Sequence, residues 1–519
     1  MISGKSDGMI ARTYSATLVG VDAVEVEIES FDGGGNPKMF IVGLPDASVK
    51  ESRERVTAAI ASCGFAMNDG VTTVNLAPAD LKKEGPGFDL PIAISLIAHR
   101  IKIPIPILAE SAMIGELALN GELRPVRGLL AVALEARAKG RKRLLVPKVQ
   151  AAEASVVAGI DIIGVHHLRE VVEYLKSDIE LPPEPCRATE FFAAAAYYDM
   201  DFADVKGQRD AKRAIEVAVA GGHNILMVGP PGTGKSMIAK RVVTIMPSMT
   251  EEEAIETTKI HSVSGLLSEQ QAFVATRPFR SPHHTISDAG LLGGGSNPGP
   301  GEVSLAHNGV LFLDELPEFR RSTLEVMRQP LEDARVTISR AAGTVTFPSL
   351  FMLVAAMNPC QCGFFGDTRR ACRCSSIMVQ KYRQRISGPL LDRIDLHLDV
   401  PLVDYQALKS TEPVESSVEI RARVEKARAI QTERFKGCKG VHTNSSMTPR
   451  LIKKHCELES EGSAMLEHAM GEMHFSARAH DRILKVARTL ADLKSLDKID
   501  ADSVLEAVNY RTLDRNLWQ

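Results

Sequence analysis

The sequence has almost no net charge: its 519 residues include 62 basic and 65 acidic side chains, a formal balance of −3. A protein-wide attraction to nucleic acid is therefore excluded, and any basic surface must be local. The chain also lacks an apolar run of membrane-spanning length, because the best candidate, 156–165, is short and contains Asp161. Its polar N-terminus has no apolar signal segment, so we expect a cytoplasmic protein with no membrane partner.

The clearest motif is a phosphate-binding loop of the pattern G-x-x-x-x-G-K-[ST], formed by Gly229, Pro230, Pro231, Gly232, Thr233, Gly234, Lys235 and Ser236. The glycines let several backbone N–H groups face one point, Lys235 brings a positive charge to the β- and γ-phosphates, and the Ser236 hydroxyl is a ligand for Mg²⁺. A short apolar run, 225–228, precedes the loop, and a helix follows it.

A second motif lies downstream at 309–315, where four apolar residues lead into two carboxylates. Asp314 is placed to hold Mg²⁺ through water, and Glu315 is placed to polarise the water that attacks the γ-phosphate. Asn358 follows another apolar run and is placed to orient this water or to sense the γ-phosphate. The minimal conclusion is a nucleoside triphosphatase with ATP and Mg²⁺ as cofactors.

Length predicts two to four domains. We place an α/β domain at 1–175, a proline-containing linker at 176–200, a nucleotide-binding α/β core at 201–405 and a helical domain at 406–519. In the first domain we expect strands over 17–28, 38–42, 71–76 and 143–147, helices over 48–63 and 128–138, and a hairpin over 115–123. In the linker, the run 191–196 is either a docking segment or a short helix.

The order of elements in the first domain resembles the proteolytic domain of Lon-type peptidases. In that family a serine follows a D-G-P triplet and a lysine follows a G-G-L triplet. Here the corresponding residues are Gly87 and Leu130, which supply neither a nucleophile nor a base. We therefore expect a Lon-like fold without peptidase activity.

Basic residues gather in two segments of the core. The loop 277–287 contains Arg280, His283 and His284, and it is either a nucleic-acid contact, a structural loop or, less in keeping with two adjacent histidines, a metal site. A hairpin expected over 335–347 carries Arg335 and Arg340, with Arg340 near its tip. These five basic residues are the candidate DNA contacts.

Four of the eight cysteines crowd into fifteen residues: Cys360, Cys362, Cys372 and Cys374. In a reducing compartment this favours metal binding over disulfides, and four thiols suit tetrahedral Zn²⁺. The C-x-C spacing also allows free thiols that pack a loop, or redox chemistry.

Two arginines have two interpretations each. Arg393, flanked by Asp392 and Asp395, is either an arginine finger that reaches a nucleotide on a neighbouring subunit or a member of a local ion network. Arg478 lies in the first turn of a helix capped by Ser476, a poor position for a cation unless it serves an anion. It is therefore either a second nucleotide sensor or a solvated charge.

Together these motifs resemble the AAA+ ATPases that include magnesium-chelatase ATPase subunits and minichromosome-maintenance helicases, and most closely the YifB/ComM family. The resemblance spans the chain and is carried by 204–208, 229–236, 280–285, 302–315, 358–360, 390–395 and 476–490. It implies a multi-domain α/β protein with an AAA+ core, a C-terminal helical lid and a Lon-protease-like N-terminal domain, with Val205 and Gly207 near the adenine.

The same resemblance implies a homo-oligomeric ring, expected to be a hexamer, and a DNA helicase that promotes branch migration of recombination intermediates during natural transformation. A magnesium-chelatase-type ATPase and a protein-remodelling ATPase are the alternatives. A DNA motor requires basic residues on the pore hairpin, whereas a protein unfoldase usually has an aromatic and apolar pore loop, which the tip 340–343 lacks.

Overall fold

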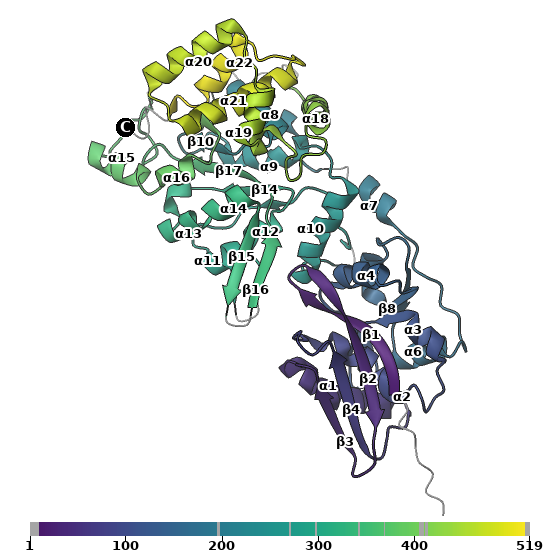
Figure 1. The fold of residues 1–519 in the computed structure, drawn as a ribbon. Coiled ribbons are helices and arrows are strands. Elements are labelled where there is room, and N and C mark those ends of the chain that lie inside the picture. Colours follow the sequence, from purple (N-terminus) through teal and green to yellow (C-terminus); the bar gives the residue numbers. More distant parts are fainter. Residues whose placement is uncertain are drawn as a thin grey trace, which may run out of the picture. The chain divides into compact units, whose positions relative to one another are not determined.

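The structure is a computed structural model that describes residues 10–194, 198–268, 271–295, 298–340, 343–367, 369–403, 409 and 414–513. The chain forms two compact units (Figure 1). The first contains the stretch up to residue 195 together with 251–275, and the second contains 196–250 and 276–519. A 25-residue segment that lies within the nucleotide-binding region of the sequence therefore packs with the N-terminal domain, which the sequence did not predict.

The first unit is built around a mixed seven-stranded sheet in the order β3-β4-β2-β1-β5-β8-β9. The strands are β1 (Ile10–Val19), β2 (Asp22–Asp32), β3 (Lys38–Val42), β4 (Val71–Ala77), β5 (Ser111–Met113), β8 (Arg143–Pro147) and β9 (Asp161–Val165), and β6 (Glu116–Leu117) with β7 (Leu123–Arg124) forms the predicted hairpin. The helices are α1 (Ala47–Ser62), α2 (Asp89–Ile97), α3 (Ile105–Ala109), α4 (Leu129–Ala138), α5 (Ala151–Ala154), α6 (Leu168–Leu175), α7 (Ala188–Ala194) and α10 (Glu251–Val263). Every residue of α2 is buried, so this helix forms the centre of the larger apolar core.

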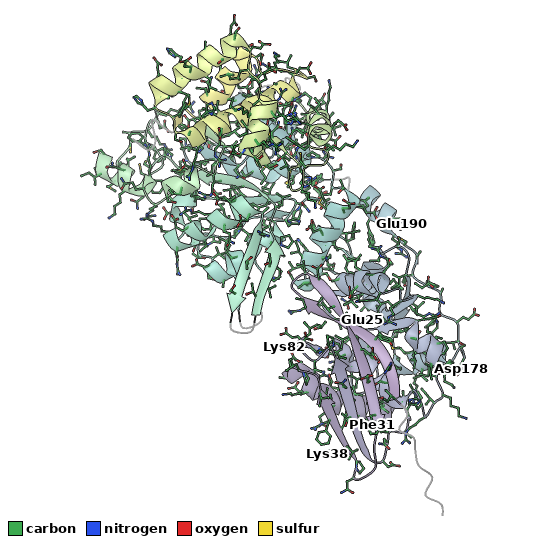
Figure 2. The ribbon with its side chains drawn as sticks, viewed as in Figure 1. Glu25, Phe31, Lys38, Lys82, Asp178 and Glu190 are labelled. Carbon is green, nitrogen blue, oxygen red and sulfur yellow. The ribbon has the colours of Figure 1, made fainter. Side chains whose placement is uncertain are left out.

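The single strand predicted over 17–28 is wrong. The chain turns at Gly20, whose φ is +68°, and β1 pairs antiparallel with β2 from Val19–Asp22 to Ile10–Phe31. The apolar positions change from odd (Val19 and Val21) to even (Val24, Val26 and Ile28) across this turn, and the single-strand prediction overlooked that break. Figure 2 shows Glu25 and Phe31 on β2, where Glu25 pairs with Arg141 and Phe31 is exposed.

The second unit contains a parallel five-stranded sheet in the order β11-β14-β17-β10-β18. Its strands are β11 (Phe279–Arg280), β14 (Val310–Leu313), β17 (Met352–Met357), β10 (Ile225–Val228) and β18 (Leu396–Asp399), and two small hairpins are β12 (Gly293–Gly294) with β13 (Gly299–Pro300) and β15 (Arg335–Arg340) with β16 (Gly343–Pro348). The helices of this core are α8 (Arg209–Gly221), α9 (Lys235–Ile245), α11 (Asp288–Leu292), α12 (Glu302–Leu305), α13 (Arg321–Val326), α14 (Arg328–Asp333), α15 (Ser376–Arg383) and α16 (Gly388–Leu391). Strands β10, β14 and β17 are buried throughout, as expected of a parallel sheet covered on both faces.

The C-terminal region is helical, as predicted, and consists of α18 (Ser417–Arg434), α19 (Pro449–His455), α20 (Ser460–Met473), α21 (Ala477–Leu493) and α22 (Ala501–Asn509). A buried polar network joins it to the sheet. The Asp395 carboxylate, just before β18, pairs with Arg482 on α21 and lies 3.2 Å from Nδ1 of His223, whose other nitrogen lies 2.9 Å from Oγ1 of Thr489 on the same helix. Burial by itself would raise the pKa of Asp395, but Arg482 and His223 lower it below its ordinary value. The helical lid is thus attached to the sheet through a charged group.

Short helices occur in both units. Residues 191–194 of the run 191–196 belong to α7, a short helix whose Phe191 and Phe192 rings lie 6.0 and 5.3 Å from the Phe273 ring. Residues 195 and 196 lie outside the described part of the chain. In the second unit, α13 and α14 are two separate short helices. Among the described residues, no helix combines the length and apolar character needed to cross a membrane.

Candidate nucleotide site

The predicted phosphate-binding loop joins the carboxyl end of β10 to the first residue of α9. Gly229 is packed so closely that an added Cβ would lie 2.2 Å from the Val400 carbonyl oxygen, and Gly232 and Gly234 have φ values of +81° and +88°. A side chain at any of the three would clash or strain the backbone. The loop therefore has the backbone curvature that phosphate binding requires.

Lys235, the first residue of α9, has its ammonium group inside the loop. Its Nζ donates hydrogen bonds to the carbonyl oxygens of Gly229 and Pro230 at 2.6 and 2.8 Å, and Oδ1 of Asn358 lies 3.4 Å away. Burial lowers the pKa of Lys235, and the negative charge of Asp314 partly opposes this shift. The structure thus brings together the predicted phosphate cation and the predicted sensor at the end of β17.

The predicted Mg²⁺ ligands are also adjacent. Ser236 Oγ donates to Oδ2 of Asp314 at 2.7 Å, which joins the start of α9 to the end of β14. A hydroxyl and a carboxylate at this separation are the oxygen ligands that Mg²⁺ prefers, and they leave coordination positions for phosphate and water. The residues present therefore fit the ion.

Glu315 follows directly and has an unusual backbone conformation. Its φ of +51° is left-handed, a conformation that non-glycine residues rarely adopt. Its side chain is half exposed, and Oε2 lies 3.5 Å from Nδ1 of His284. The loop 277–287, a candidate nucleic-acid contact, therefore reaches the predicted catalytic carboxylate through His284.

The adenine candidates, Val205 and Gly207, lie just before α8. The Val205 side chain is fully buried in the core, whereas Gly207 has a φ of +66°, and the adjacent Gln208 amide donates to the carbonyls of Thr233 at 3.2 Å and Pro401 at 2.7 Å. Gln208 thus fixes the phosphate-binding loop against the strand leading to the lid, a role that the sequence analysis missed.

Both arginines have acidic partners. Arg393 is buried and pairs with Glu332, not with the aspartates that flank it in sequence. Arg478 is exposed, and its Nη1 lies 3.4 Å from Oδ2 of Asp392. Ser476 caps α21 as predicted, with its hydroxyl accepting from the Ala479 amide at 3.2 Å.

The candidate DNA contacts differ in their surroundings. Arg280 makes a two-pronged ion pair with Glu302, with both N–O distances 2.7 Å, and this hydrogen-bonded partner raises the pKa of Arg280. The His283 and His284 rings lie 4.1 Å apart between centroids. Arg335 is exposed at the start of β15, and Arg340 is the last residue of β15, opposite Gly343. Residues 341–342 at the tip lie outside the described part of the chain.

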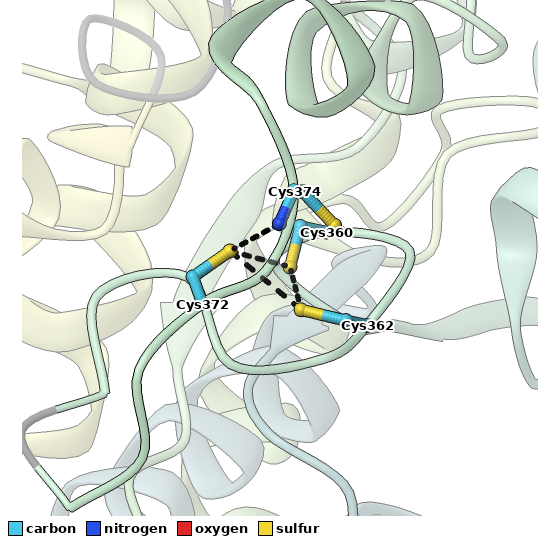
Figure 3. Close-up of side chains that lie close together, drawn as sticks. All are labelled: Cys360, Cys362, Cys372 and Cys374. Carbon is cyan, nitrogen blue, oxygen red and sulfur yellow. Dashed lines mark hydrogen bonds between the residues drawn. The ribbon is translucent and has the colours of Figure 1, made fainter.

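The four clustered cysteines meet in the loop that follows the carboxyl end of β17 (Figure 3). The Sγ atom of Cys360 lies 3.4 Å from that of Cys362 and 3.7 Å from that of Cys372, and the last two are 3.6 Å apart. All four sulfurs, including that of Cys374, lie within 4.8 Å of one another. Sulfurs bound to one tetrahedral Zn²⁺ at about 2.3 Å lie roughly 3.8 Å apart. The donor set and its spacing therefore fit a structural zinc ion.

The cysteine loop is packed against the phosphate-binding loop. An added Cβ on Gly363 would lie 2.7 Å from Cδ of Pro231, and Gly363 has a φ of +86°. Arg383 Nε donates to the Pro359 carbonyl at 3.1 Å, and its guanidinium lies 4.9 Å from the centroid of the Phe365 ring. No signal in the sequence indicated that these two loops touch.

Comparison with known proteins agrees with this architecture. Three family models match: subunit ChlI of magnesium chelatase at 201–408, a ChlI model at 24–150 and the ChlI C-terminal model at 414–511. Competence protein ComM of Haemophilus influenzae is 42% identical over 516 residues, and protein YifB of Escherichia coli is 42% identical over 510, each match covering 98% of both chains. Lon protease 2 of Bacillus subtilis is 31% identical over 149 residues, 27% of this chain and 26% of the protease.

These matches confirm the sequence-based assignment of family and fold class. Near-complete coverage at 42% identity, together with the ChlI-type models, leaves no large segment outside the relationship. The chain belongs to the YifB/ComM family of proteins with magnesium-chelatase ChlI-type AAA+ ATPase domains.

Proposed function

We propose that the chain hydrolyses ATP with Mg²⁺ and acts in the cytoplasm as a homohexameric DNA motor that promotes branch migration of recombination intermediates during natural transformation. The observation that carries the proposal is the attachment of a basic hairpin to the catalytic sheet. Hairpin β15–β16 ends at Pro348, only three residues before β17, and β17 leads directly to Asn358 in the nucleotide site. A force on the hairpin would thus reach a residue within 3.4 Å of Lys235.

In this proposal each residue at the carboxyl ends of the strands has its own role in ATP hydrolysis. Lys235 neutralises the β- and γ-phosphates, Ser236 and Asp314 hold Mg²⁺, and Glu315 polarises the attacking water. Asn358 orients that water or reports the γ-phosphate. The observed contacts support these roles: Asn358 Oδ1 lies 3.4 Å from Lys235 Nζ, and Ser236 is hydrogen-bonded to Asp314. Glu315 follows Asp314 directly, and its backbone N–H donates to the Asp314 carboxylate.

The arginines would act on a nucleotide at a subunit boundary. Arg393 would leave Glu332 to serve as an arginine finger, and Arg478 would leave Asp392 to serve as the second sensor. An exposed ion pair such as that of Arg478 contributes at most about 1 kcal/mol, so a phosphate would displace it readily.

The hairpin favours nucleic acid over a polypeptide substrate. Its exposed face carries cross-strand hydroxyl pairs, Thr337 with Thr346 at 3.1 Å and Ser339 with Thr344 at 3.2 Å. The only aromatic residue in 335–347 is Phe347, which is fully buried. Hydroxyls and arginines suit phosphate contacts, whereas an unfoldase grips with exposed aromatic residues. The Lon-like domain is the feature that would favour a protein-remodelling alternative.

The four cysteines are proposed to hold one structural Zn²⁺. Metal binding would keep the loop 360–374 folded against Pro231, and the ion takes no part in the chemistry. The sulfur separations and the buried position of Cys360 support this assignment.

We first predict that single-stranded or branched DNA stimulates the ATPase rate, and that Glu315→Gln lowers turnover at least about 100-fold with and without DNA, because it removes the base but keeps the shape. Steady-state phosphate release measures both effects. Turnover that is indifferent to DNA, with Glu315 still essential, would transfer the proposal to a protein or chelatase partner.

His284→Ala is predicted to raise DNA-free turnover about two- to fivefold, because it removes the partner that holds the Glu315 side chain. Ser281→Ala, in the same exposed loop, is the matched control. An unchanged or lower DNA-free rate in His284→Ala would show that the pair does not restrain the carboxylate.

Arg340→Ala is predicted to weaken DNA binding uniformly across sequences and to reduce the salt dependence of binding by about one phosphate contact. Arg340→Lys keeps the charge and should retain most of the affinity. Fluorescence anisotropy at several salt concentrations measures binding, and phosphate release measures turnover. If DNA affinity and DNA-free turnover fall equally, the hairpin is not the DNA contact.

Protein purified without chelator is predicted to contain about one zinc ion per chain by elemental analysis, and Cys372→Ser should lose most of it. Cys438→Ser, outside the cluster, should retain the metal. A content below roughly 0.2 zinc per chain in the unaltered protein would contradict the site, because structural zinc binds tightly.

A further inference from the structure

The segment 251–275 is the part of the molecule whose position the nucleotide chemistry does not explain. In sequence it lies between α9, which starts at Lys235, and β11, which leads to the His284 loop. In space it belongs to the N-terminal unit, so the chain passes between the two units three times. Most of one face of α10 is buried there, including Ala254, Thr257, Thr258, Ile260 and Ser262.

The end of α10 is bonded to the start of α4. The Ser262 carbonyl accepts a hydrogen bond from the Gly128 amide at 3.2 Å, and the Ser262 hydroxyl donates to the Glu153 carboxylate. The same Glu153 oxygen accepts from the Leu130 amide at 3.1 Å. Burial raises the pKa of Glu153, and the hydrogen bonds from Ser262 and Leu130 oppose that shift. One buried carboxylate therefore fastens two elements that are more than 100 residues apart.

Apolar and charged contacts extend this docking surface, which we define as Asp22, Gly128, Leu130 and Glu153 with the apolar cluster around α4. Ile255 of α10 packs against that cluster. Lys259 forms an ion pair with Asp22. The Phe273 ring, beyond α10, lies against α7. The segment is thus held at both of its ends and along its length.

The docking surface includes the position at which the resemblance to Lon-type peptidases would place a catalytic lysine. That position is Leu130, which is fully buried, and its amide is one of the groups bound to Glu153. A surface that corresponds to a catalytic position in the peptidase relatives here binds a segment of the ATPase sequence.

The residues that flank the segment on either side are hydrogen-bonded within the ATPase unit. Arg277 donates to the carbonyl of Pro247 at 2.5 Å and to that of Ser248 at 3.3 Å, just before the segment, and to the carbonyl of Asn308 at 2.8 Å, just before β14. One guanidinium thus fastens the segment's entry and exit to the strand that carries Asp314. A shift of α9 or β14 would displace both ends together.

We infer that the N-terminal domain is an internal docking partner of the ATPase, and that segment 251–275 carries the nucleotide state of the ATPase to it through α10 and α4. This inference rests on the proposed ATP site. It assigns the degenerate peptidase surface a binding role toward a segment of the same chain.

Hydrogen–deuterium exchange of the full chain, with and without a non-hydrolysable ATP analogue and Mg²⁺, tests the inference. Nucleotide should change the exchange of peptides from the phosphate-binding loop and also of peptides from 251–263 and 128–138. In Ile255→Asp, which places a charge against the apolar cluster, 251–263 should exchange at least about tenfold faster, and 128–138 should no longer respond. Glu252→Gln, exposed on the same helix, is the control and should behave as the unaltered protein.

Reversing the charges of the ion pair between Lys259 and Asp22 gives a second, milder test. Lys259→Asp should also accelerate exchange in 251–263, and Asp22→Lys in the same chain should restore it, which a general folding defect would not allow. If nucleotide changes the exchange of the phosphate-binding loop but not that of 251–263 or 128–138, the inference is overturned and the proposed ATP site still stands. Unaltered exchange of 251–263 in both Ile255→Asp and Lys259→Asp would show that the segment is not docked. No response in the phosphate-binding loop itself would overturn the ATP site and the inference with it.

Discussion

The constraint on which the nucleotide site depends is the parallel pairing of β11, β14, β17, β10 and β18. Because all five strands run the same way, their carboxyl ends meet at one edge, and whatever follows each strand is brought to the same place. Lys235 follows β10, Asp314 follows β14 and Asn358 follows β17, although 79 and 44 residues separate them in sequence. The hydrogen bonds from Ser236 to Asp314 and from Lys235 toward Asn358 are consequences of that geometry.

Side chains at this edge already have partners within the protein, and this shapes the energetics of ligand binding. Lys235 donates to loop carbonyls, Ser236 donates to Asp314, and Glu315 lies beside His284. A nucleotide must exchange these contacts for its own, so each exchange contributes less than the full strength of a charged hydrogen bond. The exchange at Lys235 involves a buried ammonium group, which must keep a partner throughout. Binding and rearrangement are therefore coupled by the demand that buried charges stay paired.

Several motifs of the second unit were predictable from the sequence, because strand–loop–helix patterns are local. The phosphate-binding loop, the acidic strand, the hairpin at 335–347 and the cap at Ser476 depend on residues only a few positions apart, and the structure contains each of them. Non-local pairings were not predictable. The partner of Arg393 lies 61 residues away rather than next to it, and the contact between Gly363 and Pro231 depends on the path of two loops. The single strand expected over 17–28 failed for a local reason, since the change of apolar phase between Val21 and Val24 marks a two-residue turn that the prediction overlooked.

Segment 251–275 shows most clearly why local pattern is insufficient. The sequence of α10 does not show which apolar surface this helix covers, so it could not be assigned to the N-terminal domain. Its apolar residues Ile255 and Ile260 could pack against either unit. What decides is the chemistry of the surface it meets. The start of α4 exposes the Gly128 and Leu130 amides, and Ser262 with Glu153 satisfies both. In a lysine-bearing peptidase, the residue at position 130 would carry a charged side chain. With leucine there, that side chain joins the apolar core, and the neighbouring amides fix α10 in place.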